Sequence, residues 1–252
     1  RMFLKYGVDT IKLNLSGEYI AGIPAEFTPM SDAEIAMAVK EAHRRGKRVA
    51  AHARSAESVK QCVRHGIEII FHASFADEEA LDMLEAAKDR HFVAPGIAWL
   101  INTSYHAAEW GITPEIAKGM GYHRELEYAC HSLKRVHRRG SRILPGGDYG
   151  YAWIKHGTNA KDLEYFVKYL GFTPMEALVA ATRLGGEIMM RGRELGQIKE
   201  GWLADLVMVD GDPVADIAVL QDPKRLLAAM KDGRFHKEPE LAGQGARRLS
   251  VA

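Results

Sequence analysis

The sequence lacks several features that would assign its function directly. It has two cysteines, Cys62 and Cys130, and neither belongs to a C-x-x-C pair, which argues against a zinc knuckle or a thioredoxin-type site. So few cysteines fit a reducing compartment, and we expect a cytoplasmic protein. No signal peptide is recognisable near Arg1. No apolar run reaches the length of about 18 residues that a membrane span needs, so we expect no membrane partner.

The chain also lacks an excess of charge. Its 252 residues include 34 Lys and Arg against 33 Asp and Glu, a formal net charge of +1. A dedicated nucleic-acid-binding protein usually carries a basic surplus, so we expect no nucleic-acid partner. Apolar residues make up 47% and charged residues 27%, which is typical of globular proteins and excludes a disordered or low-complexity chain. The length predicts one large domain, or one domain with a small appendage.

The hydrophobic pattern alternates between strands and helices over the first 150 residues or so. Strands are predicted at 8–15, 48–53, 67–72, 92–98 and 142–148, and helices at 31–45, 55–64, 77–88 and 114–139. Strands joined by helices indicate parallel crossovers, as in an open doubly wound sheet or part of an eight-stranded barrel. No G-x-G-x-x-G motif follows a strand, which disfavours the dinucleotide-binding version of the open sheet.

The pattern of predicted strands and helices changes after Asp148. Two further helices are predicted at 159–169 and 174–190, followed by a small β unit at 194–237 in which Asp232-Gly233 forms a hairpin turn. The tail at 238–252 is polar and is expected to be loose. We therefore divide the chain into residues 1–193, 194–237 and 238–252.

Four residues that can carry chemistry lie at or near the carboxyl ends of predicted strands: Lys12, His52, His72 and Asp148. In parallel α/β folds active sites gather at that edge. Two imidazoles and a carboxylate are good ligands for a divalent metal, although a histidine after an apolar strand is often structural. Lys12 lies in an apolar stretch, where a buried ammonium needs a partner or loses its charge, unless it extends to solvent at a strand edge.

Five segments in order carry a family resemblance. They are Gly7-Val8-Asp9-Thr10-Ile11-Lys12-Leu13, Arg48-Val49-Ala50-Ala51-His52-Ala53, Gly66-Ile67-Glu68-Ile69-Ile70-Phe71-His72-Ala73, Pro145-Gly146-Gly147-Asp148 and Gly196-Gln197-Ile198-Lys199-Glu200-Gly201-Trp202-Leu203-Ala204-Asp205-Leu206-Val207. The sequence resembles the metal-dependent amidohydrolase superfamily, in its imidazolonepropionase-like and Xaa-Pro dipeptidase-like (carboxypeptidase-type) branch. The resemblance implies the C-terminal portion of an α/β, (β/α)8 TIM-like barrel, with strands four to eight present, and a small flanking β-sandwich segment.

The resemblance also implies roles for the strand-end residues. Lys12 matches a lysine that CO₂ carboxylates and that bridges two metal ions, and His52 and His72 match metal-binding histidines. Asp148 matches an aspartate that binds metal and acts as general base and acid for a metal-bound hydroxide. The implied cofactor is a divalent metal, most often Zn, with one or two ions.

The sequence departs from the family pattern in its metal ligands. No His-x-His pair occurs anywhere, although the family carries one on its first barrel strand. We therefore expect the chain to be a C-terminal part that a partner chain or a homo-oligomer completes, since an incomplete barrel exposes an unpaired edge. Phe71-His72-Ala73 replaces the family's Glu-His-Gly, and Ser16-Gly17-Glu18-Tyr19 replaces a Gly-Gly loop, so the specificity of relatives should not be transferred.

Aromatic and basic residues in the loops suggest a substrate site. We predict that Tyr105, His106, Arg54 and Tyr149 bind substrate, through a carboxylate or the scissile carbonyl. The favoured hypothesis is hydrolysis of an amide or peptide bond in a small or dipeptide-like substrate. Two alternatives remain: a cyclic amidohydrolase or deaminase of a heterocycle, which Lys12 disfavours, and a non-catalytic fragment that needs a partner.

Overall fold

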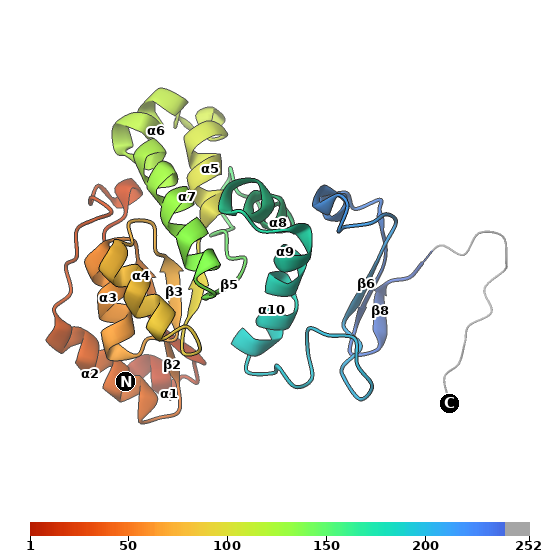
Figure 1. Ribbon diagram of the computed structural model, residues 1–252, viewed down its shortest axis with the longest axis horizontal. Coiled ribbons are helices and arrows are strands. Elements are labelled where there is room, and N and C mark those ends of the chain that lie inside the picture. Colours follow the sequence, from red (N-terminus) through yellow and green to blue (C-terminus); the bar gives the residue numbers. More distant parts are fainter. Residues whose placement is uncertain (240–252) are drawn as a thin grey trace.

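The computed structural model describes residues 1–239, and its first part alternates strands with helices as predicted (Figure 1). The five parallel strands are β1 (Thr10–Asn14), β2 (Arg48–Ala53), β3 (Ile69–His72), β4 (Phe92–Ala94) and β5 (Arg142–Ile143). Helix α1 (Met2–Lys5) precedes them, and η1 (Tyr19–Ala21), α2 (Asp32–His43), α3 (Ala56–His65), α4 (Glu78–Ala86), α5 (Ile97–Tyr105), η2 (Ala108–Trp110), α6 (Pro114–Met120) and α7 (Tyr122–Arg138) lie between them.

The strand order distinguishes between the two predicted architectures. The strands pair in the order β1-β2-β3-β4-β5, with no reversal. Right-handed crossovers in a sequential order place all connecting helices on the same side of the sheet, which is the arrangement of a barrel. In Figure 1, α2, α3 and α4 lie together against the strands. Among residues 1–239, β1 and β5 each pair on one side only, so the barrel is not closed.

Local signals fix the helix ends. Helix α2 begins after Ser31, whose side chain accepts a hydrogen bond from the Glu34 N–H while Glu34 accepts one from the Ser31 N–H. Thr173 and Glu176 form the same capping box at α9 (Pro174–Ala181). Strand β2 is buried along nearly its whole length, as expected for a strand covered on both faces. These boundaries follow from residues close in sequence.

Several predicted elements are shorter or broken. The helix predicted at 114–139 divides into α6 and α7 at Gly121, which has φ 103° and packs against the Tyr19 ring, so that a Cβ there would lie 2.8 Å from Tyr19 Cζ. Strand β4 ends before Pro95, and β5 contains two residues. The helix predicted at 159–169 is α8 (Lys161–Tyr165) followed by the π-helical η3 (Phe166–Leu170), and the next divides into α9 and α10 (Arg183–Ile188).

The β unit predicted at 194–237 is a separate antiparallel sheet. It contains β6 (Leu206–Val209), β7 (Leu226–Lys231) and β8 (Arg234–Lys237), with η4 (Ile217–Gln221) between the first two. Asp232 and Gly233 both have positive φ, as the predicted hairpin turn requires. Helices α8 to α10 separate this sheet from the parallel one (Figure 1). Most of the tail predicted at 238–252 lies outside the described residues.

Two further findings concern membrane spans and cysteines. Over residues 1–239, no helix is both long and apolar enough to cross a membrane. Cys62 and Cys130 are free thiols, the first buried and the second half-buried.

Candidate functional site

The two strand-end histidines lie in contact. His52 is the fifth residue of β2 and His72 the last of β3, and they are 8% and 1% exposed. The Nε2 atom of His72 lies 3.0 Å from Nδ1 of His52, and their ring centroids are 4.6 Å apart. The sequence prediction that these residues meet at the carboxyl edge of the sheet is therefore correct for this pair.

Backbone geometry brings His72 toward His52. In the β2–β3 register His52 pairs with Phe71, and His72 pairs with Ala53, so His72 lies one residue beyond the position opposite His52. Successive side chains in a regular strand point to opposite faces. His72 has φ 78° and the following Ala73 φ 55°, which breaks the alternation at the strand end. Such non-glycine residues are uncommon and gather at functional sites.

The environment keeps both imidazoles neutral. Burial, and next the charge of Arg54, lowers the pKa of His52 and holds the pKa of His72 well below its usual range. The Nε2 atom of His52 lies 2.9 Å from the Gly17 carbonyl oxygen, which can only accept, so Nε2 donates and Nδ1 presents a lone pair toward His72. A neutral imidazole with a free lone pair is the form that binds metal.

Asp148 completes the cluster from the irregular segment after β5. It lies beyond β5, and its Oδ2 is 3.7 Å from Nε2 of His72. Its side chain is about one-third exposed, and its backbone has φ 55°. Gly96 permits this approach, because a Cβ there would lie 2.8 Å from Nδ1 of His72 and 3.6 Å from the Asp148 carboxylate.

Lys12 is exposed. Of the two settings that the sequence left open, a buried apolar strand and a solvent-exposed strand edge, the structure shows the second, because β1 is an edge strand and no further strand covers it among the described residues. Its Nζ lies 4.7 Å from the centre of the Phe71 ring, a cation–π contact. Its charge contributes to lowering the pKa of both His52 and His72, which places it near the pair. The carboxylation of Lys12 stays a prediction.

Arg54 is held by two carboxylates. Its side chain is fully buried and forms ion pairs with Glu125 of α7, which is also fully buried, and with Glu18 of the loop after β1. Ser74 donates a second hydrogen bond to Glu125, at 2.7 Å. In this arrangement the guanidinium offers no open face to a substrate, and the predicted substrate contact of Arg54 stays untested.

Sequence reasoning missed both partners of Arg54. Glu125 had a visible signal, because it lies on the apolar face of its helix beside Tyr122, Leu126 and Ala129. A carboxylate on such a face needs a buried partner. Glu18 lies in an irregular loop and gave no such signal.

The aromatic substrate candidates lie on different elements. Tyr105 ends α5 and is half exposed, with its ring 5.0 Å from that of His123, and His106 follows it in an exposed position. Tyr149 follows Asp148; the residue is half-buried, and its buried hydroxyl has no hydrogen-bond partner among the described residues. Tyr149 is thus next to the histidine–aspartate cluster because it directly follows Asp148 in the sequence. Within the described part, the structure shows no contact between that cluster and Tyr105 or His106.

The cluster fits part of a metal site. Across residues 1–239, no group of three or more His, Cys, Asp or Glu side chains is arranged so that it could hold a metal ion. Nevertheless the facing nitrogens of His52 and His72 have nearly the spacing, about 3.3 Å, of two ligands on one tetrahedral zinc ion. Asp148 adds an oxygen on the same side. These three donors would supply a partial ligand set, with Lys12 nearby.

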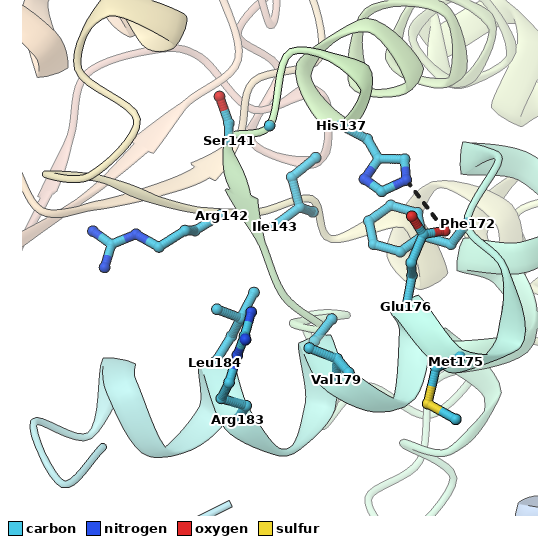
Figure 2. A pocket seen from close by; sticks show the side chains of 12 residues that line it. His137, Ser141, Arg142, Ile143, Phe172, Met175, Glu176, Val179, Arg183 and Leu184 are labelled. Carbon is cyan, nitrogen blue, oxygen red and sulfur yellow. Dashed lines mark ion pairs between the residues drawn. The ribbon is translucent and has the colours of Figure 1, made fainter. Parts of the chain in front are cut away.

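A separate cavity lies at the other end of β5. Its volume is about 340 Å³, and its walls come from the end of α7, from β5 and from α9 and α10 (Figure 2). Figure 2 shows the His137–Glu176 ion pair at 3.7 Å beside Phe172, on which the imidazole stacks. Gly140, Ser141 and Arg142 precede or begin β5, whereas Asp148 follows it, so this cavity does not include the cluster.

Known proteins match most of the length of this chain. The model of the amidohydrolase family matches residues 1–235. Ochratoxinase from Aspergillus niger is 25% identical over 255 residues, which is 97% of this chain and 50% of that protein. The chain therefore spans about half the length of the curated relatives it matches.

Two solved structures share the fold. A Xaa-Pro dipeptidase with bound methionine in its active site has a TM-score of 0.81 and 28% identity, over 93% of this chain and 56% of that one. A prolidase complexed with N-methylphosphonate-L-proline has a TM-score of 0.83 and 28% identity, over the same shares. The fold is accordingly of the TIM-barrel type, which confirms the predicted barrel. In the residues described, the barrel is not closed.

Proposed function

The chain belongs to the amidohydrolase family, and from that premise we propose that it hydrolyses an amide or peptide bond in a small, dipeptide-like or N-acyl amino acid substrate. The observation that carries the proposal is the convergence of His52 and His72, at the carboxyl ends of β2 and β3, with Asp148 of the segment after β5. Relatives named as a Xaa-Pro dipeptidase, a prolidase and an ochratoxinase support this class of reaction.

The metal proposal rests on the donor set. His52, His72 and Asp148 would hold a divalent ion, most simply Zn²⁺, and carboxylated Lys12 would allow a second. Such an ion supplies Lewis acidity toward the carbonyl and toward water. Burial keeps the two imidazoles unprotonated and therefore ready to bind.

Asp148 is proposed as the proton carrier. Its carboxylate is partly open to solvent and lies next to His72, so a substrate and a water molecule can both reach it. It takes the proton from the attacking water and returns it to the leaving nitrogen, which removes the need for a poor amide leaving group to depart as an anion. Tyr149, Tyr105 and His106 are proposed to bind the substrate's polar groups, and Arg54 to act there through Glu18.

The incomplete barrel suggests a partner. Within residues 1–239 the parallel sheet has unpaired edges at β1 and β5, and an unpaired strand edge is a template for further pairing. We propose that additional polypeptide completes the barrel, either from another protein chain or from a homo-oligomer. Free thiols at Cys62 and Cys130 support a reducing, cytoplasmic location.

A second candidate function is a non-catalytic half that requires this partner. It is favoured by the incomplete ligand set among residues 1–239. Metal content separates the two candidates. Independent catalysis predicts at least one bound ion for each purified chain, and a dependent half predicts none until the partner is added.

The test combines metal analysis with hydrolysis. Purified chain is assayed on panels of N-acyl amino acids and dipeptides, with the Asp148→Asn variant and the Asp9→Asn control, whose carboxylate is 95% exposed. We expect Asp148→Asn to slow hydrolysis about 10²- to 10⁴-fold and Asp9→Asn to retain the wild-type rate. Equal rates for Asp148→Asn and wild type would contradict the role of Asp148.

A further inference from the structure

A buried carboxylate lies behind the segment that carries Asp148. Asp162 is in the first turn of α8 and is 1% exposed. Its Oδ1 atom is buried without a hydrogen-bond partner, and so is the hydroxyl of the neighbouring Tyr149. Buried acids without a full set of partners are rare and call for an explanation. The family motifs that led to His52, His72 and Asp148 do not include this residue.

The backbone of the Asp148 segment rests directly on this carboxylate. A Cβ on Gly147 would lie 2.8 Å from both Asp162 oxygens and 2.4 Å from Cε2 of Tyr149. Only glycine fits at a contact this close. The Gly146 backbone lowers the pKa of the Asp162 carboxyl, an effect that favours the charged form of that group.

No strand pairing holds this segment. Strand β5 ends at Ile143, so the sheet does not fix residues 146–148. Asp148 nevertheless adopts φ 55°, a backbone conformation that persists only where the surroundings impose it. The nearest support shown for this segment is Asp162 of α8, which lies against Gly147.

We propose that Asp162 is a positioning residue, which holds the Gly146–Gly147–Asp148 turn and thereby keeps the Asp148 carboxylate beside His72. The inference rests on the proposed function in so far as Asp148 acts at that site. In this role Asp162 acts as a hydrogen-bond acceptor for the turn and as a surface that fits behind it, and it does not contact the substrate.

The protonation of Asp162 supports an acceptor role over a charge role. Burial raises its pKa to about 7, against the lowering effects of Tyr149 and Gly146, and Asp148 adds to the rise. Near neutral pH the group is therefore not fully charged. An asparagine keeps an acceptor oxygen in the same place, so it should replace much of the function, whereas alanine should not.

The test measures local opening by hydrogen exchange. In the purified chain, we expect Asp162→Ala to raise amide exchange in a peptide covering residues 144–151 about tenfold, relative to a peptide covering 48–54. Asp162→Asn should change it less than about threefold. Glu164→Gln is the matched control, since it also removes a carboxylate from α8. That carboxylate accepts a hydrogen bond from Gln221 and not from the Asp148 segment. If Asp162→Ala does not fold, Gly147→Ala disturbs the same contact from the other side and should give the same local rise.

The same variants are titrated with Zn²⁺. Loss of an outer-sphere positioning group typically weakens metal binding about 10- to 100-fold, and we expect that loss in Asp162→Ala and its recovery in Asp162→Asn. Unchanged exchange in residues 144–151, or an equal rise in both peptides, would overturn the inference. If wild type takes up no Zn²⁺, the proposed metal site fails, and the exchange comparison still decides the role of Asp162.

Discussion

The Nδ1 atom of His52 lies 3.0 Å from Nε2 of His72, so two buried imidazoles share one polar contact at the edge of the parallel sheet. The Gly17 carbonyl fixes the proton of His52 on its other nitrogen. Among residues 1–239, no carboxylate lies within hydrogen-bond distance of either ring to stabilise a positive charge on it; the Asp148 carboxylate lies 3.7 Å from His72. The pair is therefore built to remain neutral, and the protein's stability should depend on pH accordingly.

The pH dependence has a defined direction. Because burial lowers the pKa of His52 and His72 in the folded state, the unfolded chain binds more protons below its histidine pKa of about 6.5. Stability is then complete above about pH 6.5 and falls as the pH drops toward the folded-state pKa values, by up to about 1.4 kcal/mol per pH unit for each histidine. Urea unfolding of chelator-treated protein between about pH 7.5 and pH 5.5 measures it.

Variants assign this dependence to the pair. His72→Asn should flatten the slope, whereas His106→Asn, at an exposed position, should leave it as in wild type. A wild-type slope in His72→Asn would show that the pair does not cause the effect.

Zinc should stabilise the chain through these residues. At a zinc concentration about 100 times its dissociation constant, binding to the folded state alone adds about 2.7 kcal/mol and raises the melting temperature. His72→Asn should lose most of this increase, and His106→Asn should keep it. Differential scanning fluorimetry with and without Zn²⁺ makes the comparison, and equal shifts in all three proteins would place the zinc elsewhere.

The buried ion pair of Arg54 and Glu125 should be costly to break. Glu125→Gln leaves the guanidinium in a fully buried position with one of its two carboxylates removed, which we expect to lower the free energy of unfolding by about 3–5 kcal/mol. Glu85→Gln removes one partner of the surface residue Arg139 and should cost no more than about 1 kcal/mol. Urea unfolding of both variants tests the difference, and a loss below about 1 kcal/mol in Glu125→Gln would contradict the burial argument.

Gly17 should tolerate no side chain. A Cβ there would lie 2.0 Å from the Pro24 carbonyl oxygen and 2.7 Å from Cγ2 of Ile23, so Gly17→Ala must displace the loop whose carbonyl orients His52. We expect a loss of about 1–3 kcal/mol in unfolding free energy.

Gly119 provides the matched control for this substitution. It lies inside α6, and nothing lies within 4 Å of its ideal Cβ. Gly119→Ala should therefore stabilise the chain by about 0.5–1 kcal/mol, since alanine is the better helix former. If urea unfolding showed that Gly17→Ala and Gly119→Ala change the free energy of unfolding in the same direction, the argued difference in packing would be refuted.

The sequence by itself determined the order of elements and the place of the cluster. Capping residues such as Ser31 and Thr173, the Asp232-Gly233 turn and the apolar strand patterns act over a few residues, so they can be read without a fold. His52 and His72 could also be predicted to meet, because the carboxyl ends of consecutive parallel strands lie at one edge.

The tertiary structure alone decided what surrounds that cluster. Arg54 meets Glu125 across 71 residues of sequence, and Asp162 reaches the Asp148 turn from a later helix. Lys12 is exposed because β1 is an edge strand, which its own apolar neighbours did not indicate. Such features depend on which elements pack together and on backbone angles such as φ 78° at His72, and no local pattern encodes either of them.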